Sequence, residues 1–528
     1  MFEKRGCIFQ NVLIYASFVQ NYNMPKSKII YLILFLSLAY FPLFYNLDAW
    51  SLRKWDEARN AVGAVNMQNT GDYLVRLYND KLDAWETKPP MLLWIQTLFM
   101  KVLGPTMWAI RLPSALATLF LMLAIIFFCG KTLDDWTAGF LSAFALLVSD
   151  GFIKAHVSRT GDHDALLTFF LILSIFYFYK WLKNKQLADI LWAALWTFLA
   201  VMTKSIVGLM FLPGLFIYAV FSRQLGKILR GPAIYLAGLS LVLGIGFYYF
   251  LAEWTHAGYL KAVWQMELLP RFQNTGGKYI QPEAGHYLNL LVKNERFPFW
   301  YLLPFCVWAA WKMGHPDLKK FVGIPLSIGL VFSVIMSFGV WYDWYDAPLY
   351  PLWSLIFGCG LSAIFKKMTI NGFKNQPKYW VVGFVFLGVG VLFSRAYYKV
   401  SKRIYENGTY QKPNEQYGEY VEKCLKMGQI CDFSMLFSSI DPYDAPMQYY
   451  KKILHRKQQE VNLIYVNLKT DTLSNPHLGL LNRDSIAIGN RYLSCHTELT
   501  DTIKKHFKIR LLEQTGDCSL FQIEEKIR

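Results

Sequence analysis

The chain has 528 residues, of which 54% are hydrophobic and 17% aromatic, and its formal net charge is +17. This is more apolar material than a soluble single-core domain needs, and it falls into discrete blocks, so the sequence predicts a polytopic α-helical membrane protein. The excess of Lys and Arg is explained by the positive-inside rule of membrane proteins, and no nucleic-acid motif accompanies it.

The first apolar block, residues 29–47, is long enough to cross a bilayer, which takes roughly 20 apolar residues. No small-residue cleavage site follows it, so we expect a retained first helix and not a signal peptide. Residues 1–23 precede a natural start at Met24, and we interpret them as an upstream extension. The block at residues 90–104 is shorter, and we expect it to lie flat at the interface or to re-enter the membrane.

The later apolar blocks raise the expected number of transmembrane helices to about 11. They lie at residues 108–129, 138–156, 164–181, 187–203, 205–222, 232–252, 297–311, 320–339, 346–365 and 379–396.

The charges between these blocks predict the orientation. Lys and Arg gather in alternate connections, whereas the short connections 157–163 and 340–345 carry only Arg159 between them. By the positive-inside rule, the poorly charged connections face outward. The predicted parts are a cytoplasmic segment (1–28) and a transmembrane domain (29–396) with outer loops at 48–107 and 253–296.

The remaining residues, 397–528, are predicted to form a small soluble α/β domain outside the membrane, because short strand patterns alternate with helical ones. The expected strands lie at 430–437, 461–468, 485–489 and 508–513, and the expected helices at 444–454 and 497–507. A location outside the cytoplasm would permit disulfides among the four cysteines of this part, Cys424, Cys431, Cys495 and Cys518, but the sequence does not decide whether they form.

Carboxylates cluster where two of the expected spans meet the outer face. Asp56 and Glu57 follow the first span, where they could act as a base, bind a metal or steer charged substrates. The alternative is that they only stabilise the N-terminus of a helix. Asp162-His163-Asp164 lies at the start of the 164–181 span. Acidic side chains at the end of a membrane helix cost free energy, so their presence there indicates a function. Capping of that helix is the alternative explanation.

Cations on the same face complement these acids. Lys88 precedes Pro89-Pro90, which fix the backbone, and a Lys there suits a phosphate, although it could merely snorkel. Lys204 lies between two apolar blocks, against the positive-inside trend, which indicates an anionic partner. In the long outer loop, Arg271 stands out, and His286 could bind a metal or move a proton, although a lone loop histidine more often does neither.

Seven motifs occur in an order that resembles the bacterial aminoarabinose lipid A transferase and protein O-mannosyltransferase superfamily, over roughly residues 29–400. They are Asp56-Glu57-Ala58-Arg59, Gly71-Asp72-Tyr73-Leu74-Val75, Lys88-Pro89-Pro90, Trp108-Ala109-Ile110-Arg111-Leu112-Pro113-Ser114, Asp164-Ala165-Leu166-Leu167-Thr168, Thr203-Lys204-Ser205-Ile206-Val207-Gly208 and Tyr345-Asp346-Ala347-Pro348-Leu349-Tyr350-Pro351. The resemblance implies the GT-C fold and a polyprenyl-phosphate-linked sugar donor.

The resemblance also implies roles for individual residues. Asp56 would be the principal catalytic acid and Asp164 the second. The expected contacts to the donor phosphate or headgroup are Arg59, Lys88, Lys204 and Tyr345, to which we add Glu57 and Arg271. His286 and Glu86 are the expected ligands of a divalent metal.

Two positions depart from the family pattern. Thr87 stands where the family often has Glu directly before Lys-Pro-Pro, and Glu86 lies one residue earlier. Trp341 stands where a Lys is common, four residues before the Tyr-x-x-Pro motif. The first departure weakens the inference of a metal site. The second removes a cation that could contact the donor phosphate in that turn.

We therefore expect a multi-pass glycosyltransferase of the bacterial inner membrane that moves a sugar, with inversion, from an undecaprenyl-phosphate donor to lipid A on the periplasmic side. A protein, as in protein O-mannosylation, or another glycan is the alternative acceptor. A lipid or ion transporter is a different class, which the gathering of polar residues on one face disfavours. A third alternative gives the function to the C-terminal domain and leaves the spans as an anchor.

Overall fold

The computed structural model describes residues 26–53, 55–78, 81–154, 156–269, 296–337, 342, 344–372, 379–406 and, with gaps, parts of 417–527. Within this part, six helices are long and apolar enough to cross a membrane, so the chain is a multi-pass membrane protein. They are α5 (Met107–Thr132), α7 (Asp164–Asn184), α8 (Leu187–Lys204, extended by a 3₁₀ turn to Leu209), α11 (Pro232–Thr255), α16 (Pro316–Met336) and α17 (Leu349–Gly372).

The other apolar blocks are also helical, but the predicted count of about 11 spans is not confirmed. Among the described residues, four apolar helices are short, namely α2 (Lys26–Phe44), α4 (Met91–Leu103), α6 (Trp136–Leu147) and α9 (Leu212–Phe221). The blocks at 297–311 and 379–396 contribute to α15 (Leu303–Met313) and α18 (Tyr379–Glu406). Some blocks contain a turn: α6, for example, ends at Leu147, within the block predicted to reach residue 156.

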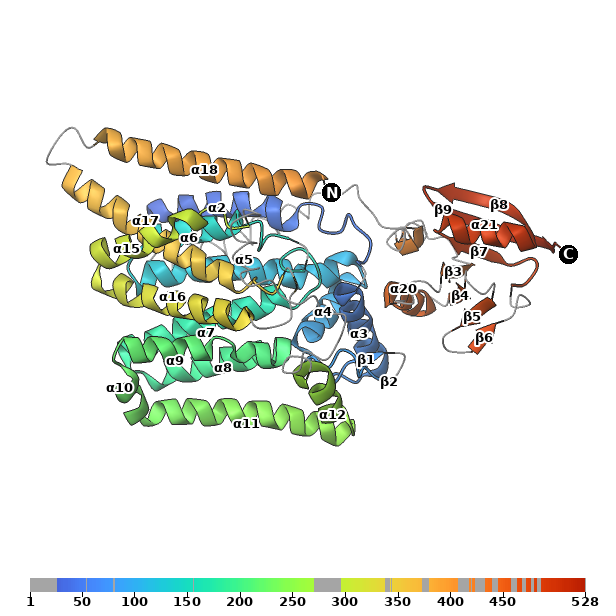
Figure 1. Ribbon diagram of the computed structural model, residues 1–528, viewed down its shortest axis with the longest axis horizontal. Coiled ribbons are helices and arrows are strands. Elements are labelled where there is room, and N and C mark those ends of the chain that lie inside the picture. The colour runs from blue at the N-terminus through green and yellow to red at the C-terminus, as the bar shows by residue number, and fades with distance from the viewer. Residues whose placement is uncertain are drawn as a thin grey trace, which may run out of the picture.

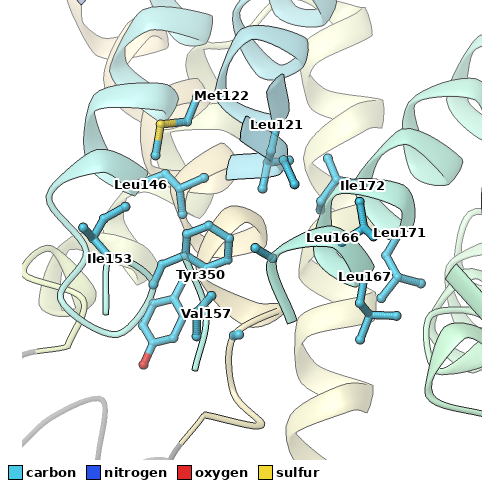
Figure 2. Close-up of a cluster of buried hydrophobic side chains, with 14 of the residues drawn as sticks. Leu121, Met122, Leu146, Ile153, Val157, Leu166, Leu167, Leu171, Ile172 and Tyr350 are labelled. Atoms are coloured by element: carbon cyan, nitrogen blue, oxygen red, sulfur yellow. The ribbon is translucent and has the colours of Figure 1, made fainter. Parts of the chain in front are cut away.

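The helices run alongside one another in one bundle (Figure 1). Helices α5, α6, α7 and α17 enclose a core to which Tyr350 contributes its ring (Figure 2). Where α6, α15 and α17 meet, glycines allow the backbones to approach. A Cβ on Gly358 would come within 2.1 Å of the Ser142 hydroxyl, and one on Gly360 within 2.4 Å of the Cys306 carbonyl oxygen.

The first long loop forms a small cap at one end of the bundle (Figure 1). It consists of α3 (Asp56–Thr70), a hairpin of β1 (Leu77–Tyr78) and β2 (Lys81–Leu82), and α4 (Met91–Leu103). Helix α3 ends at Gly71, whose φ of 73° closes the last turn in the left-handed region. Helix α4 has 13 residues, fewer than a span needs, in agreement with the expectation for residues 90–104.

The C-terminal part contains a mixed seven-stranded sheet of order β6-β5-β4-β3-β7-β9-β8. Its strands are β3 (Ser434–Ser438), β4 (Leu463–Asn467), β5 (Thr472–Asn475), β6 (Gly479–Leu481), β7 (Arg491–Ser494), β8 (Phe507–Thr515) and β9 (Cys518–Lys526). Helix α20 (Ala445–Arg456) connects the parallel strands β3 and β4, and α21 (Thr497–His506) precedes β8. The strand expected at 485–489 is wrong, since the described residues there form a turn before β7.

A disulfide joins Cys495, just after β7, to Cys518 at the start of β9. The other two candidate cysteines, Cys424 and Cys431, lie outside the described residues.

The sheet domain touches the cap through α20, which packs on α3. The Tyr450 hydroxyl accepts a hydrogen bond from the Leu52 backbone N–H at 3.2 Å, and the Tyr449 hydroxyl donates one to the Pro105 carbonyl at 3.0 Å. The sheet domain therefore contacts both α3 and the segment directly before it.

Candidate functional site

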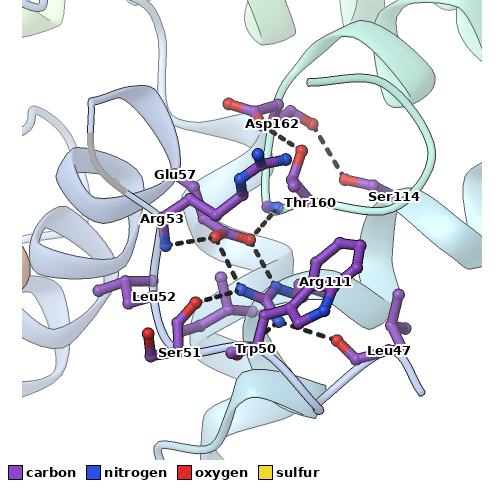
Figure 3. A network of polar contacts seen from close by, with 12 residues as sticks. Leu47, Trp50, Ser51, Leu52, Arg53, Glu57, Arg111, Ser114, Thr160 and Asp162 are labelled. Atoms are coloured by element: carbon purple, nitrogen blue, oxygen red, sulfur yellow. Dashed lines mark hydrogen bonds and ion pairs between the residues drawn. The ribbon is translucent and has the colours of Figure 1, made fainter. Parts of the chain in front are cut away.

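A buried ion pair organises the start of α3. Arg111 of α5 is fully buried, and its guanidinium donates to both carboxylate oxygens of Glu57, at 2.8 and 3.0 Å (Figure 3). The remaining N–H groups donate to the backbone carbonyls of Leu47, Trp50 and Ser51 at 2.8–2.9 Å. Burial opposes ionisation of Glu57, but Arg111 outweighs it and holds the pKa of this carboxyl below its usual range.

Glu57 also fixes the loop that leads into α7. One of its oxygens accepts a hydrogen bond from the Gly161 backbone N–H at 2.9 Å, and Asn60 donates to the Gly161 carbonyl at 2.8 Å. The Ser114 hydroxyl donates to the carbonyl of the following residue, Asp162, at 3.0 Å. Two acidic segments about a hundred residues apart in the chain are thus held against each other.

Asp56, next to Glu57 at the start of α3, lies close to Asp162 and His156 of the loop that leads into α7. One potential ligand atom from each residue lies within 4.8 Å of the other two. The His156 ring stacks on Trp344 at 3.9 Å between centroids. Burial raises the pKa of Asp162 to about 6; Asp56 and Glu57 add to this rise, and His156 opposes it.

Two carboxylates and an imidazole are a ligand set that divalent cations accept. Among the described residues, the buried Asp162 Oδ1 atom has no hydrogen-bond partner, and neither has the His156 Nδ1 atom, which lies 3.7 Å from Asp162 Oδ2. These residues therefore fit a metal, which would supply positive charge beside Asp56. Of the ligands expected from the sequence, Glu86 pairs with Lys88, and His286 lies outside the described residues.

Asp164, Lys204 and Tyr345, expected to share the site, lie together. The Lys204 ammonium at the end of α8 donates to the Asp164 carboxylate at the start of α7, at 2.6 Å. The same ammonium lies 4.7 Å from the centre of the Tyr345 ring. Asp164 is thus the anionic partner that the position of Lys204 indicated.

Arg59 and Lys88 are each paired with an acid of the first loop. Arg59 donates to both oxygens of Asp83, at 2.8 and 2.6 Å. Lys88 donates to Glu86. Burial opposes both charges of that second pair, yet Glu86 raises the pKa of Lys88, and Lys88 with neighbouring arginines lowers the pKa of Glu86 to about 2.

The remaining predicted contact, Arg271, lies outside the described residues. Sequence reasoning missed His156 because it ends an apolar block and counted as part of a span. It also gave no role to Arg111, although a charge within a long apolar helix is a signal in itself.

Known proteins resemble this chain in sequence. Residues 87–249 match the family described as dolichyl-phosphate-mannose-protein mannosyltransferase. A protein of Aquifex aeolicus is 27% identical over 59% of this chain and 60% of its own length. The undecaprenyl phosphate-alpha-4-amino-4-deoxy-L-arabinose arabinosyl transferase 2 of Pseudomonas fluorescens is 24% identical over 79% of this chain and 68% of its own length. The chain thus spans about 60% of the Aquifex relative.

The fold agrees with a solved structure. ArnT from Cupriavidus metallidurans, bound to undecaprenyl phosphate, superposes with a TM-score of 0.68 at 15% identity over 93% of this chain and 97% of that one. This chain has the GT-C fold. The resemblance to the glycosyltransferase family that its motifs indicated is therefore confirmed.

Proposed function

We propose that this GT-C protein is a glycosyltransferase that transfers a sugar from a polyprenyl-phosphate carrier to an envelope acceptor. The observation that supports this most directly is the pairing of acids and cations at one end of the bundle. There Asp56 lies near Asp162 and within electrostatic range of Lys88, while Lys204 holds Asp164. Such a site offers both a carboxylate for the acceptor and cations for a departing phosphate.

In the proposed reaction, an acceptor oxygen attacks the anomeric carbon of the sugar while the bond from that carbon to the carrier phosphate oxygen breaks. Asp56 orients the acceptor hydroxyl and takes its proton, and the leaving phosphate keeps the bonding electrons. Lys88, Lys204 and Arg59 stabilise the charge on that phosphate. A single displacement of this kind inverts the configuration at the anomeric carbon.

We assign undecaprenyl phosphate as the carrier and lipid A as the acceptor, since two Pseudomonas relatives are named as undecaprenyl phosphate-dependent arabinosyl transferases. A protein acceptor is the second candidate, which the family match over residues 87–249 favours. The bacterial inner membrane, with the site on the periplasmic side, is the location that the charge pattern and the Cys495–Cys518 disulfide support. Tyr345, Arg271 and Glu57 remain proposed substrate contacts, and His286 and Glu86 remain proposed metal ligands.

The test is mass spectrometry of lipid A and envelope glycoproteins from cells that lack the gene and carry wild type or Asp56→Asn. We expect wild type to restore a sugar that Asp56→Asn, at equal expression, restores at least roughly a hundredfold more slowly, as for the loss of a general base. Asp501→Asn, on the exposed face of α21, is the matched control and should behave as wild type. Full restoration by Asp56→Asn would refute the role of Asp56, and no glycan change on deletion would favour transport.

A further inference from the structure

Arg76 is a buried cation for which the described residues provide no hydrogen-bond partner. It lies between α3 and β1, only 3% of its surface is exposed, and its stem packs against Gly63 of α3. All three guanidinium nitrogens are buried without a hydrogen bond. Glu86 acts on Arg76 electrostatically, but its carboxylate is hydrogen-bonded to Lys88. A buried guanidinium that makes no hydrogen bond costs several kcal/mol, which a bound anion would offset.

The surroundings of Arg76 indicate that the missing partner is an anion. Arg76, Lys88 and Lys204 all act electrostatically on His163, which is 3% exposed and has a buried Nε2 atom without a partner. Glu86 and Asp164 already engage the two lysines directly, whereas neither donates or accepts a hydrogen bond with Arg76.

The chemistry of the guanidinium favours a phosphate. Its planar fork binds two phosphate oxygens at once, which an ammonium cannot do. An apolar cluster that includes Val75, Met202 and Val263 lies beside this segment, so a charge bound there is shielded from water and held more strongly. Lys88 acts electrostatically on both Asp56 and the His163 ring, so an anion bound beside Lys88 would share the surroundings of the proposed base.

We propose that Arg76 is a ligand for the phosphate of the lipid carrier, binding it in a bidentate manner beside Lys88 and Lys204, with His163 lining the same site. This assignment rests on the proposed function and adds a residue that lies just outside the motif Gly71-Asp72-Tyr73-Leu74-Val75. Arg76 touches the phosphate both before and after sugar transfer, so it contributes to carrier binding and to stabilisation of the leaving group.

The experiment measures binding of undecaprenyl phosphate to the full-length protein in nanodiscs by native mass spectrometry. The variants are Arg76→Gln and Arg76→Lys, and Arg395→Gln on the exposed face of α18 is the matched control. We expect Arg76→Gln to weaken binding roughly tenfold or more, as for the loss of hydrogen bonds to a charged group. Arg76→Lys should retain part of the affinity, and Arg395→Gln all of it.

Two further arms identify the ligand. Undecaprenol, which lacks the phosphate, should not bind in an Arg76-dependent way. Inorganic phosphate that binds wild type in an Arg76-dependent way, without any binding of the lipid, would overturn the assignment to the carrier.

The outcomes separate this inference from the proposed function. Equal binding of undecaprenyl phosphate by wild type and Arg76→Gln would overturn the role of Arg76 and leave the glycosyltransferase intact. If wild type does not bind the lipid, both proposals fail. In the absence of lipid, Arg76→Gln should unfold at or above the wild-type temperature, because it removes an unpaired buried charge. A large fall in that temperature would show that Arg76 is structural and would also overturn the assignment.

Discussion

Asp56 and Glu57 are neighbours in the chain, yet their carboxylates lie in different surroundings. Glu57 is buried and satisfied by Arg111 and two backbone N–H groups, whereas Asp56 is half-buried and lies near His156 and Asp162. An acid whose oxygens are already engaged is poorly placed to take a proton from a substrate. We therefore propose that Asp56 acts as the base and that Glu57 positions the residues around the substrate it contacts.

The first prediction concerns this pair. Glu57→Gln leaves the Arg111 guanidinium buried without a carboxylate, and breaking a buried pair in this way costs about 3–5 kcal/mol. We expect a clear fall in the thermal unfolding temperature of the purified protein in detergent. Glu406→Gln, which disturbs an exposed pair with Lys402, is the matched control and should change it little. A fall no larger than that of the control would contradict the proposed clamp.

The second prediction concerns metal binding by Asp56, His156 and Asp162. If these residues hold a divalent cation, EDTA lowers the unfolding temperature of wild type and added Mn²⁺ restores it, since a ligand bound only by the folded state stabilises it. We expect His156→Ala and Asp162→Asn to abolish this response. The matched control is His506→Ala, at the end of α21, which should respond as wild type does. An unchanged response in the two site variants would exclude the triad.

At the scale of elements, the site depends on where neighbouring helices begin and end. Helix α7 begins with Asp164 and α8 ends with Lys204, and the two helices pack along each other, so their ends bring the charges to 2.6 Å. Helices α6 and α17 also pack closely, at Gly358 and Ser142. Lipid provides no hydrophobic drive for helices to associate, so they associate through close packing of their side chains and backbones. Small residues such as glycine allow this close approach.

The third prediction tests that contact. Gly358→Val places a side chain where a Cβ already comes within 2.1 Å of Ser142, and we expect destabilisation of about 1–3 kcal/mol. Gly388→Val on α18 is the matched control, since a Cβ there meets no atom within 4 Å. The measurement is the thermal unfolding temperature of both variants in the same detergent. Equal effects of the two substitutions would show that the α6–α17 contact tolerates a larger residue.

At the scale of the whole molecule, the sheet domain contacts the cap close to the proposed site. Helix α20 packs on α3, and the Tyr450 hydroxyl bonds to the Leu52 backbone a few residues before Asp56. A domain in this position can limit which acceptors reach Asp56. The proposed orientation requires it to lie outside the cytoplasm, where its disulfide is stable.

The fourth prediction tests this orientation with reporters fused to the full-length chain. Alkaline phosphatase fused after Arg528 should be active, and green fluorescent protein at the same place should be dark. Fusions that end after Lys227, in a connection proposed to face the cytoplasm, should give the opposite pair of results. The same outcome at both positions would contradict the proposed topology.

The sequence by itself determined the class of the molecule. Apolar blocks, charge asymmetry and ordered motifs indicated a membrane glycosyltransferase fold with a small C-terminal α/β part, because these are properties of composition and short-range order. It also offered Asp56, Asp164, Lys88 and Lys204 as candidate site residues, since charges beside apolar spans are conspicuous in a sequence. The predicted number of spans is not confirmed, because an apolar block does not reveal where the chain turns within it.

Only the tertiary structure decided which charges meet. The pairing of Arg111 with Glu57 and the approach of His156 to Asp56 depend on contacts between segments far apart in the chain. So does the burial of Arg76 without a hydrogen-bond partner among the described residues. No local pattern encodes such contacts, because a side chain's partner is set by the packing of whole helices. For the same reason, the sequence could name acids and cations but could not separate those that hold the site together from those left to act on a substrate.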